Sequence, residues 1–146
     1  MQVSSIMVSN VLTIEAGGST RQAAKLMDEH RISSLLVVSE GKLIGIVTEK
    51  DLVVRLLARG LSPEKTLVEE IMSYPVITTG PDADLEEATK KMLVNGIKKL
   101  PVVEDSHVVG ILSLTDVAKT YPAVYSALQK IVQETKKAAA PNFYIS

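Results

Sequence analysis

The chain has 146 residues, of which 46% are hydrophobic, 23% are charged and only 3% are aromatic, so we expect one domain or two very small ones with an aliphatic core. A formal net charge of −1 gives no general attraction for nucleic acid or an anionic membrane, and the lack of cysteine excludes disulfides and thiolate chemistry. No apolar window is long enough to span a membrane and no leader is evident, so we expect a cytoplasmic protein.

The first elements expected along the chain are a helical turn at Ser4–Met7 and a short strand at Val11–Ile14. An amphipathic helix follows, because Ser19 and Gln22 have the spacing of a capping box. Its apolar face is predicted to carry Ala23, Leu26, Met27 and His30. Strands at Leu35–Val38 and Leu43–Val47 then form a hairpin around a tight polar turn.

A second helix is expected at Lys50–Arg59, and Gly60–Glu64 ends it with glycine and Ser-Pro signals. The same order of elements then recurs 65 positions later, since Val3–Val53 aligns without a gap on Val68–Ala118 and 15 of the 51 pairs are identical. The chain is therefore predicted to contain two copies of one β-α-β-β-α unit. This order of elements indicates an α/β (α+β) fold. We expect the two small sheets to pack against each other around a pseudo-twofold axis.

The second copy is expected to contain the same elements as the first. Thr66 and Glu69 suggest a capping box before a helical turn, and Asp84 and Glu87 suggest the start of the amphipathic helix. The remaining expected elements are a turn at Glu69–Met72, strands at Val76–Thr78, Leu100–Val103 and Val108–Leu112, and a helix from Thr115. Pro122 then begins a last helix with an apolar stripe that ends near Lys137.

These elements divide the chain into residues 1–60 as the first repeat, 61–67 as a linker, 68–121 as the second repeat and 122–146 as a helix and tail. Residues 138–146 fit no predicted element.

Each copy ends its last strand with a hydroxyl residue that is followed three positions later by a carboxylate. The pairs are Thr48 with Asp51 and Ser113 with Asp116. One interpretation is a helix cap, which contributes about 0.5–2 kcal/mol, and Asp51 could also pair with Arg55 four residues on. The other is a ligand site, because a strand-to-helix turn presents N–H groups and side-chain oxygens that can hold a sugar or a phosphate.

The duplicated pattern, including Gly45-Ile46-x-Thr48-x-x-Asp51 and Gly110-Ile111-x-Ser113-x-x-Asp116, resembles a tandem pair of CBS domains, often called a Bateman module. The resemblance covers roughly residues 3–120 without insertion. It implies a non-catalytic regulatory module that binds AMP, ADP or ATP in clefts between the repeats. It also implies a disc-like homodimer formed through CBS helices, and an effector protein that the sequence does not identify.

The resemblance assigns ligand residues to two clefts, and both ribose motifs are intact. One cleft would contain Asp116, Ser113, Ile111, Thr13, Ile14 and Ile32, and the other Asp51, Thr48, Ile46, Thr78, Thr79 and Ile97. A basic pair before the second strand often contacts phosphate in such proteins. Lys98 and Lys99 occupy this position in the second repeat, but Ser33 and Ser34 occupy it in the first, which disfavours a polyphosphate beside Asp51.

Two alternatives stay open: a dimerisation or interaction module without a functional ligand, and a binder of S-adenosylmethionine. No nucleophile–base pair or other catalytic constellation is visible, so an enzyme is not expected. His30 and His107 have no metal-ligand partners in sequence, so no metal is expected.

Overall fold

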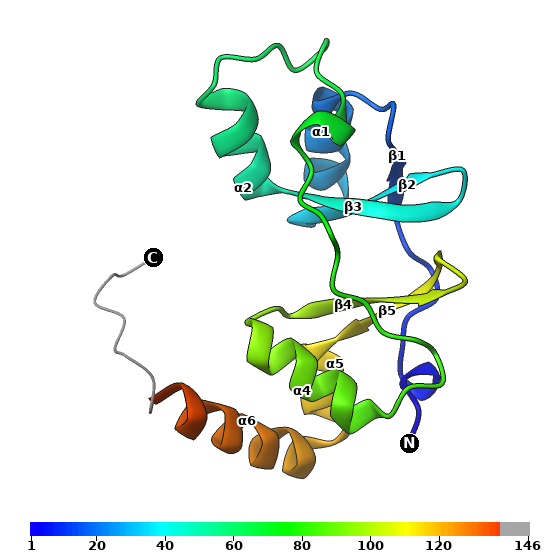
Figure 1. Cartoon of the computed structure of the whole chain (residues 1–146), viewed down its shortest axis with the longest axis vertical. Helices are drawn as coiled ribbons and strands as arrows, with labels where there is room; N and C mark the ends of the chain where they lie inside the picture. Colours follow the sequence, from blue (N-terminus) through cyan, green and yellow to red (C-terminus); the bar gives the residue numbers. More distant parts are fainter. Residues whose placement is uncertain (138–146) are drawn as a thin grey trace. The chain divides into compact units, whose positions relative to one another are not determined.

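The apolar patterns of the two repeats fold largely as predicted, into a mixed α+β protein. The computed structural model describes residues 1–137, which are grouped into two units (Figure 1). Unit 1 contains Met1–Ser9, Thr78–Val102 and residues 109–137, whereas unit 2 contains Asn10–Ile77 and Val103–Val108. The first nine residues therefore pack with the second repeat. No helix within residues 1–137 has both the length and the apolar character needed to cross a membrane.

Unit 2 is built on three strands, β1 (Thr13–Glu15), β2 (Ser34–Ser39) and β3 (Lys42–Thr48). β1 runs parallel to β2, with Ile14 opposite Val37, and β2 runs antiparallel to β3. The predicted strand at Val11–Ile14 thus begins two residues later. The tip of the hairpin in the second repeat also belongs to unit 2, where Lys42 pairs antiparallel with His107.

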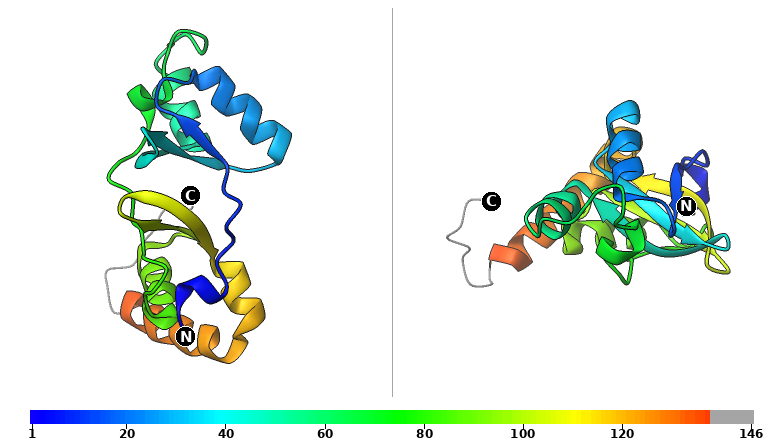
Figure 2. Two further views of the ribbon diagram at one scale, coloured as in Figure 1. Left: turned by 90° about the vertical axis from the view of Figure 1, so that its right-hand side faces the viewer. Right: turned by 90° about the horizontal axis from the view of Figure 1, so that it is seen from above.

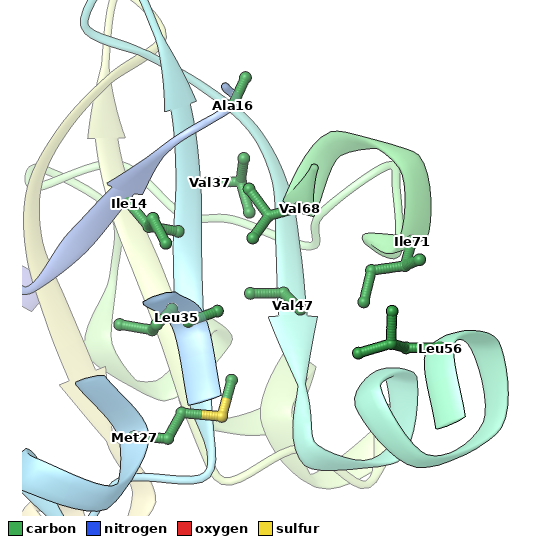
Figure 3. Packing of buried hydrophobic residues seen from close by; sticks show 10 residues of the cluster. Ile14, Ala16, Met27, Leu35, Val37, Val47, Leu56, Val68 and Ile71 are labelled. Carbon is green, nitrogen blue, oxygen red and sulfur yellow. The ribbon is translucent and has the colours of Figure 1, made fainter. Parts of the chain in front are cut away.

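The core of unit 2 lies between this sheet and its helices. Helix α1 (Thr20–His30) buries Ala23 and Met27 but leaves His30 exposed. Apolar side chains from the strands meet those of the helices in one cluster (Figure 3). Its buried members are Ile14, Ala16, Ala23, Met27, Leu35, Val37, Val47, Leu56, Val68 and Ile71.

The helix predicted at Lys50–Arg59 is divided into two parts. A single α-turn, α2 (Glu49–Asp51), passes into a π-helical segment, η2 (Leu52–Leu57). The wider turn is visible in the bond from the Ala58 N–H to the Val53 carbonyl, five residues apart. A 3.6-residue periodicity argument assumes regular i to i−4 bonds, so it could not anticipate this change.

Helix caps follow the predictions in part. The Ser19 hydroxyl accepts a hydrogen bond from the Gln22 N–H at 3.0 Å, as the capping box predicts. Asp84 makes no such cap on α4 (Leu85–Asn95). The N-terminal segment supplies an acceptor to a different N–H of this helix start, since the Leu85 N–H donates to the Met1 carbonyl at 2.8 Å.

The capping box predicted from Thr66 and Glu69 does not form, and only its carboxylate half appears, one residue further along the chain. Helix α3 (Val68–Ile71) begins after Leu67, whose N–H donates to the Glu70 carboxylate at 2.6 Å.

Unit 1 repeats the plan of unit 2 with differences in its first strand. Its elements are η1 (Val3–Ser5), α4, α5 (Leu114–Thr120), α6 (Pro122–Lys137) and the larger parts of β4 (Lys99–Glu104) and β5 (His107–Ser113), whose hairpin tip belongs to unit 2. The turn predicted at Ser4–Met7 is thus a short 3-10 helix. The strand predicted at Val76–Thr78 does not form, and only Thr79 bridges to Val102. Pro101 in β4 has no N–H to donate, so fewer backbone hydrogen bonds can form between β4 and a strand beside it.

Two equivalent glycines allow the strands to approach a methionine closely. A Cβ on Gly45 would lie 2.3 Å from the Met72 sulfur, and one on Gly110 would lie 2.8 Å from the Met7 sulfur. The repeated glycine of the motif therefore has a packing role in both units, and the repeated methionines are its partners.

Helix α6 packs against α4 and α5, as Figure 2 shows from a second direction. Tyr121 and Tyr125 pack on the unit 1 core and Val132 is buried, whereas Ile131 of the predicted stripe is exposed. The predicted tail at residues 138–146 lies outside the described residues.

Candidate functional site

The first copy of the hydroxyl–carboxylate motif forms a complete capping box. Thr48 ends β3, and its hydroxyl accepts a hydrogen bond from the Asp51 N–H at 3.1 Å. In return, Asp51 Oδ2 accepts one from the Thr48 N–H at 3.0 Å. The capping interpretation is confirmed for this copy.

Asp51 also has partners outside the cap. The Ser73 hydroxyl lies 3.0 Å from Oδ1 and 3.2 Å from Oδ2, and Arg55 Nε lies 3.6 Å from Oδ1. The Asp51 side chain is 7% exposed, so the pairing with Arg55 expected from the spacing forms at a buried carboxylate. We call Thr48, Asp51, Arg55 and Ser73 the Asp51 cluster.

Backbone contacts hold Ser73 and Arg55 in place. Ser73 exchanges two hydrogen bonds with Ile46 of β3, at 2.8 Å and 3.0 Å. Arg55 Nη1 donates to the carbonyls of Ile71 and Met72, at 3.2 Å and 2.9 Å. The Asp51 cluster thus connects the start of α2 and segment η2 to the end of α3.

The second copy of the motif has no such cluster. Ser113 precedes α5 without a side-chain cap, and the half-buried Asp116 has no hydrogen bond or ion pair to any of residues 1–137. Val8 exchanges the equivalent backbone bonds with Ile111, at 2.9 Å and 2.8 Å, so it takes the place of Ser73. Thr120 stands at the position of Arg55.

The basic pair lies beside the second motif. The Leu114 N–H, at the start of α5, donates to the Lys98 carbonyl at 2.8 Å, and both Lys98 and Lys99 are exposed. In unit 2 the matching bond runs from the Glu49 N–H to the Ser33 carbonyl at 3.0 Å. Positive side chains are thus available near Asp116 and are replaced by serines near Asp51.

The predicted site residues divide between the two units. Unit 2 contains Thr13, Ile14, Ile32, Ser33, Ile46, Thr48 and Asp51, and unit 1 contains Thr78, Thr79, Ile97, Lys98, Lys99, Ile111, Ser113 and Asp116. Sequence reasoning did not identify Ser73 as a partner of Asp51. The only signal was that the alignment pairs Ser73 with the apolar Val8.

Within the described part of the chain, no group of three or more His, Cys, Asp or Glu side chains is arranged to hold a metal ion.

The chain is similar to proteins of known sequence and structure. It is 36% identical over 126 residues to an uncharacterized protein of Methanopyrus kandleri, a match that covers 83% of this chain and 63% of that protein's length. The chain therefore spans less than two thirds of that relative.

Two solved structures share the fold. Hypoxic Response Protein I, crystallised with two coordinated zinc ions, has a TM-score of 0.74 and 26% identity, with 82% of this chain and 98% of that chain covered. The CBS domain pair of MJ0100, in complex with 5′-methylthioadenosine and S-adenosyl-L-methionine, has a TM-score of 0.70 and 34% identity. This second match covers 84% of this chain and 96% of that one.

The family model for the CBS domain matches twice, at residues 3–58 and 68–123, once in each copy of the internal repeat. Tandem CBS domains are regulatory modules. The chain belongs to the CBS domain family, as a tandem pair.

Proposed function

We propose that the chain is a non-catalytic sensor that binds an adenosine-containing ligand through Asp116 and Ser113, with AMP, ADP or ATP as the first candidates. The observation that carries the proposal is the half-buried Asp116 carboxylate at the start of α5, which has no partner among residues 1–137. An acceptor of this kind is open to donors from a ligand.

The chemistry of a ribose suits this position. Its two neighbouring hydroxyls can both donate to one carboxylate, and a hydrogen bond to a charged group contributes about 1.5–3 kcal/mol. Ser113 adds a hydroxyl that can donate or accept. The adenosine-type ligands bound by the MJ0100 pair support the same ligand class for this chain.

The lysines favour a phosphorylated member of that class. The Lys98 backbone lies beside the start of α5, and both lysine side chains are exposed, so their ammonium groups are open to an anionic ligand. S-adenosylmethionine has no phosphate and carries a positive sulfonium, so its single carboxylate offers these charges less than a phosphate does. Lys98 and Lys99 should therefore contribute more to the binding of a nucleotide than to the binding of S-adenosylmethionine.

Ligand-induced stabilisation tests this proposal. AMP, ADP, ATP, S-adenosylmethionine and 5′-methylthioadenosine are each added in a thermal-shift titration. A ligand at a hundred times its dissociation constant adds about 2.7 kcal/mol to the free energy of unfolding, which raises the Tm of a chain of this size by several degrees. No shift with any of the five compounds would contradict the proposal.

A second candidate is an assembly module, and the surface of η2 favours it. Val53, Val54 and Leu57 are 55%, 47% and 74% exposed, an apolar face that a second copy of the chain could cover in a homodimer. Sedimentation of the wild type and of Leu57→Glu tests this. The variant should be monomeric where the wild type is dimeric, while Val94→Glu, at an exposed site on α4, should leave the assembly unchanged.

A further inference from the structure

We infer that the two copies of the motif have separate roles. The Asp51 cluster stabilises the fold, and its carboxylate is already hydrogen-bonded within unit 2, so only the Asp116 copy is open to a ligand. The role of Asp51 is argued from unit 2 alone, whereas the role of Asp116 rests on the function proposed above. The resemblance to CBS pairs implied two competent motifs, and the contacts in unit 2 argue for one.

The Asp51 carboxylate is occupied by donors from its own unit. Its two oxygens accept from the Thr48 N–H at 3.0 Å and from the Ser73 hydroxyl at 3.0 Å and 3.2 Å, with Arg55 Nε at 3.6 Å. A carboxylate offers about four lone-pair sites, so little capacity remains. The Ser73 hydroxyl lies within bonding distance of both oxygens, where a ligand hydroxyl would have to be.

Displacing Ser73 would disturb more than one bond. Its backbone is paired with Ile46 in both directions, and Arg55 is held by the carbonyls of Ile71 and Met72. Arg55 also lies within the π-turn closed by the Ala58 N–H and the Val53 carbonyl. A ligand hydroxyl at Asp51 would therefore compete with a donor that the fold already holds in place.

Of the four side chains in the Asp51 cluster, the second copy retains only the hydroxyl and the carboxylate of the motif. Val8 replaces Ser73, Thr120 replaces Arg55, and α5 is a regular α-helix where η2 is a π-helix. The backbone of Val8 nevertheless pairs with Ile111 as Ser73 pairs with Ile46. One side chain at this position thus decides whether a hydroxyl is delivered to the carboxylate.

A stability cycle tests the structural half without any ligand. Asp51→Ala is expected to lower the Tm by about 5 °C, because a buried bonded carboxylate is lost, while Asp116→Ala should shift it by less than about 2 °C. Adding Ser73→Ala to Asp51→Ala should cause little further loss, since the two side chains act on each other. Equal losses for the two aspartates, or fully additive losses in the cycle, would overturn the assignment.

Calorimetric titration with AMP, ATP and S-adenosylmethionine tests the ligand half. The expected stoichiometry is one per chain, lost in Asp116→Ala. Ser73→Ala should retain this site, and Val8→Ser, which brings a competing hydroxyl to the position, should weaken binding about tenfold. Two equivalents on the wild type, one of them lost with Asp51→Ala, would refute the inference. If no compound binds while the stability cycle is non-additive, the proposed function fails and the structural role of Asp51 stands.

Discussion

Asp51 and Asp116 occupy equivalent places in one repeated motif, yet their side chains differ in their contacts both within the motif and outside it. Asp51 is 5% exposed and is bonded to Thr48 and Ser73, whereas Asp116 is half-buried and unpaired within residues 1–137. A buried charge without partners would be costly, so the neighbours of Asp51 are required by its burial. Asp116 retains access to solvent, and this access makes it the better candidate for a ligand.

The lysines near Asp116 provide the first residue-level prediction. Replacing both Lys98 and Lys99 with alanine should weaken ATP binding about tenfold, because lost phosphate contacts are charge-assisted hydrogen bonds. Binding of S-adenosylmethionine should weaken less, because this ligand has no phosphate. Calorimetry on both ligands gives the comparison, with Lys90→Ala on the exposed face of α4 as the matched control. Equal losses for the two ligands would argue against a phosphate contact.

The second residue-level prediction concerns Gly45, the glycine of the repeated motif. Gly45→Ala would bring a methyl group to 2.3 Å from the Met72 sulfur, so the side chain or the strand must shift. We expect a loss of about 1–3 kcal/mol in the free energy of unfolding, the usual cost of overpacking. Gly17→Ala, where no atom lies within 4 Å, serves as the control in urea unfolding. A neutral Gly45→Ala would show that the packing there is loose.

At the scale of elements, Arg55 joins η2 to α3. Its guanidinium donates to the carbonyls of Ile71 and Met72, the last residues of a four-residue helix and its cap. Carbonyls at a helix C-terminus have no intrahelical partner, and a cation is favourable there. A short helix that would not persist alone is thereby attached to η2.

The corresponding prediction concerns a substitution at Arg55. Arg55→Ala should lower the free energy of unfolding by about 1–3 kcal/mol, since it leaves helix-end carbonyls and the buried Asp51 with fewer donors. Arg59→Ala, at an exposed position just beyond η2, should be close to neutral. Chemical denaturation of the two variants gives the contrast, and equal stabilities would exclude a role for Arg55 in holding α3.

Regular elements were predictable because their signals are local. The hairpin of Leu35–Val38 and Leu43–Val47 was identified from its apolar runs and polar turn, and Pro122 does begin α6. The predictions that failed depended on distant partners. Thr79, next to the predicted strand at Val76–Thr78, bonds to Pro101, and Asp84 at the start of α4 lies 3.9 Å from the Met1 ammonium. Neither partner is visible in a local window of sequence.

The same distinction applies to the candidate site. The motif residues Thr48, Asp51, Ser113 and Asp116 were identified by their spacing and recurrence. Ser73 was missed because its proximity to Asp51 arises from backbone pairing with Ile46, a tertiary contact without a periodic signature.

At the scale of the whole molecule, sequence repeats and compact units do not coincide. Residues Met1–Ser9 pack in unit 1 with the second repeat, where Val3 is fully buried, and the start of the second repeat packs in unit 2. Each repeat therefore needs a segment from the other to complete its core. Because of this exchange, residues Met1–Ser9 contribute to the core of unit 1.

Removing Met1–Met7 tests this exchange. The deletion takes Val3 from the core of unit 1 and removes the acceptor for the Leu85 N–H, so unit 1 should lose stability. Amide hydrogen exchange should show protection lost mainly in α4, β4 and α5, while β2 and β3 stay protected. Uniform loss of protection, or none, would contradict the assignment of this segment to unit 1.

The most direct measurement of the central claim is calorimetric titration of AMP and 2′-deoxy-AMP into the wild type and Asp116→Ala. If Asp116 accepts hydrogen bonds from both ribose hydroxyls, the deoxy analogue should bind the wild type about tenfold more weakly, because one charge-assisted bond is lost. Asp116→Ala should bind both compounds poorly and without preference. Equal affinity of the wild type for AMP and 2′-deoxy-AMP, or an unchanged affinity in Asp116→Ala, would contradict the account.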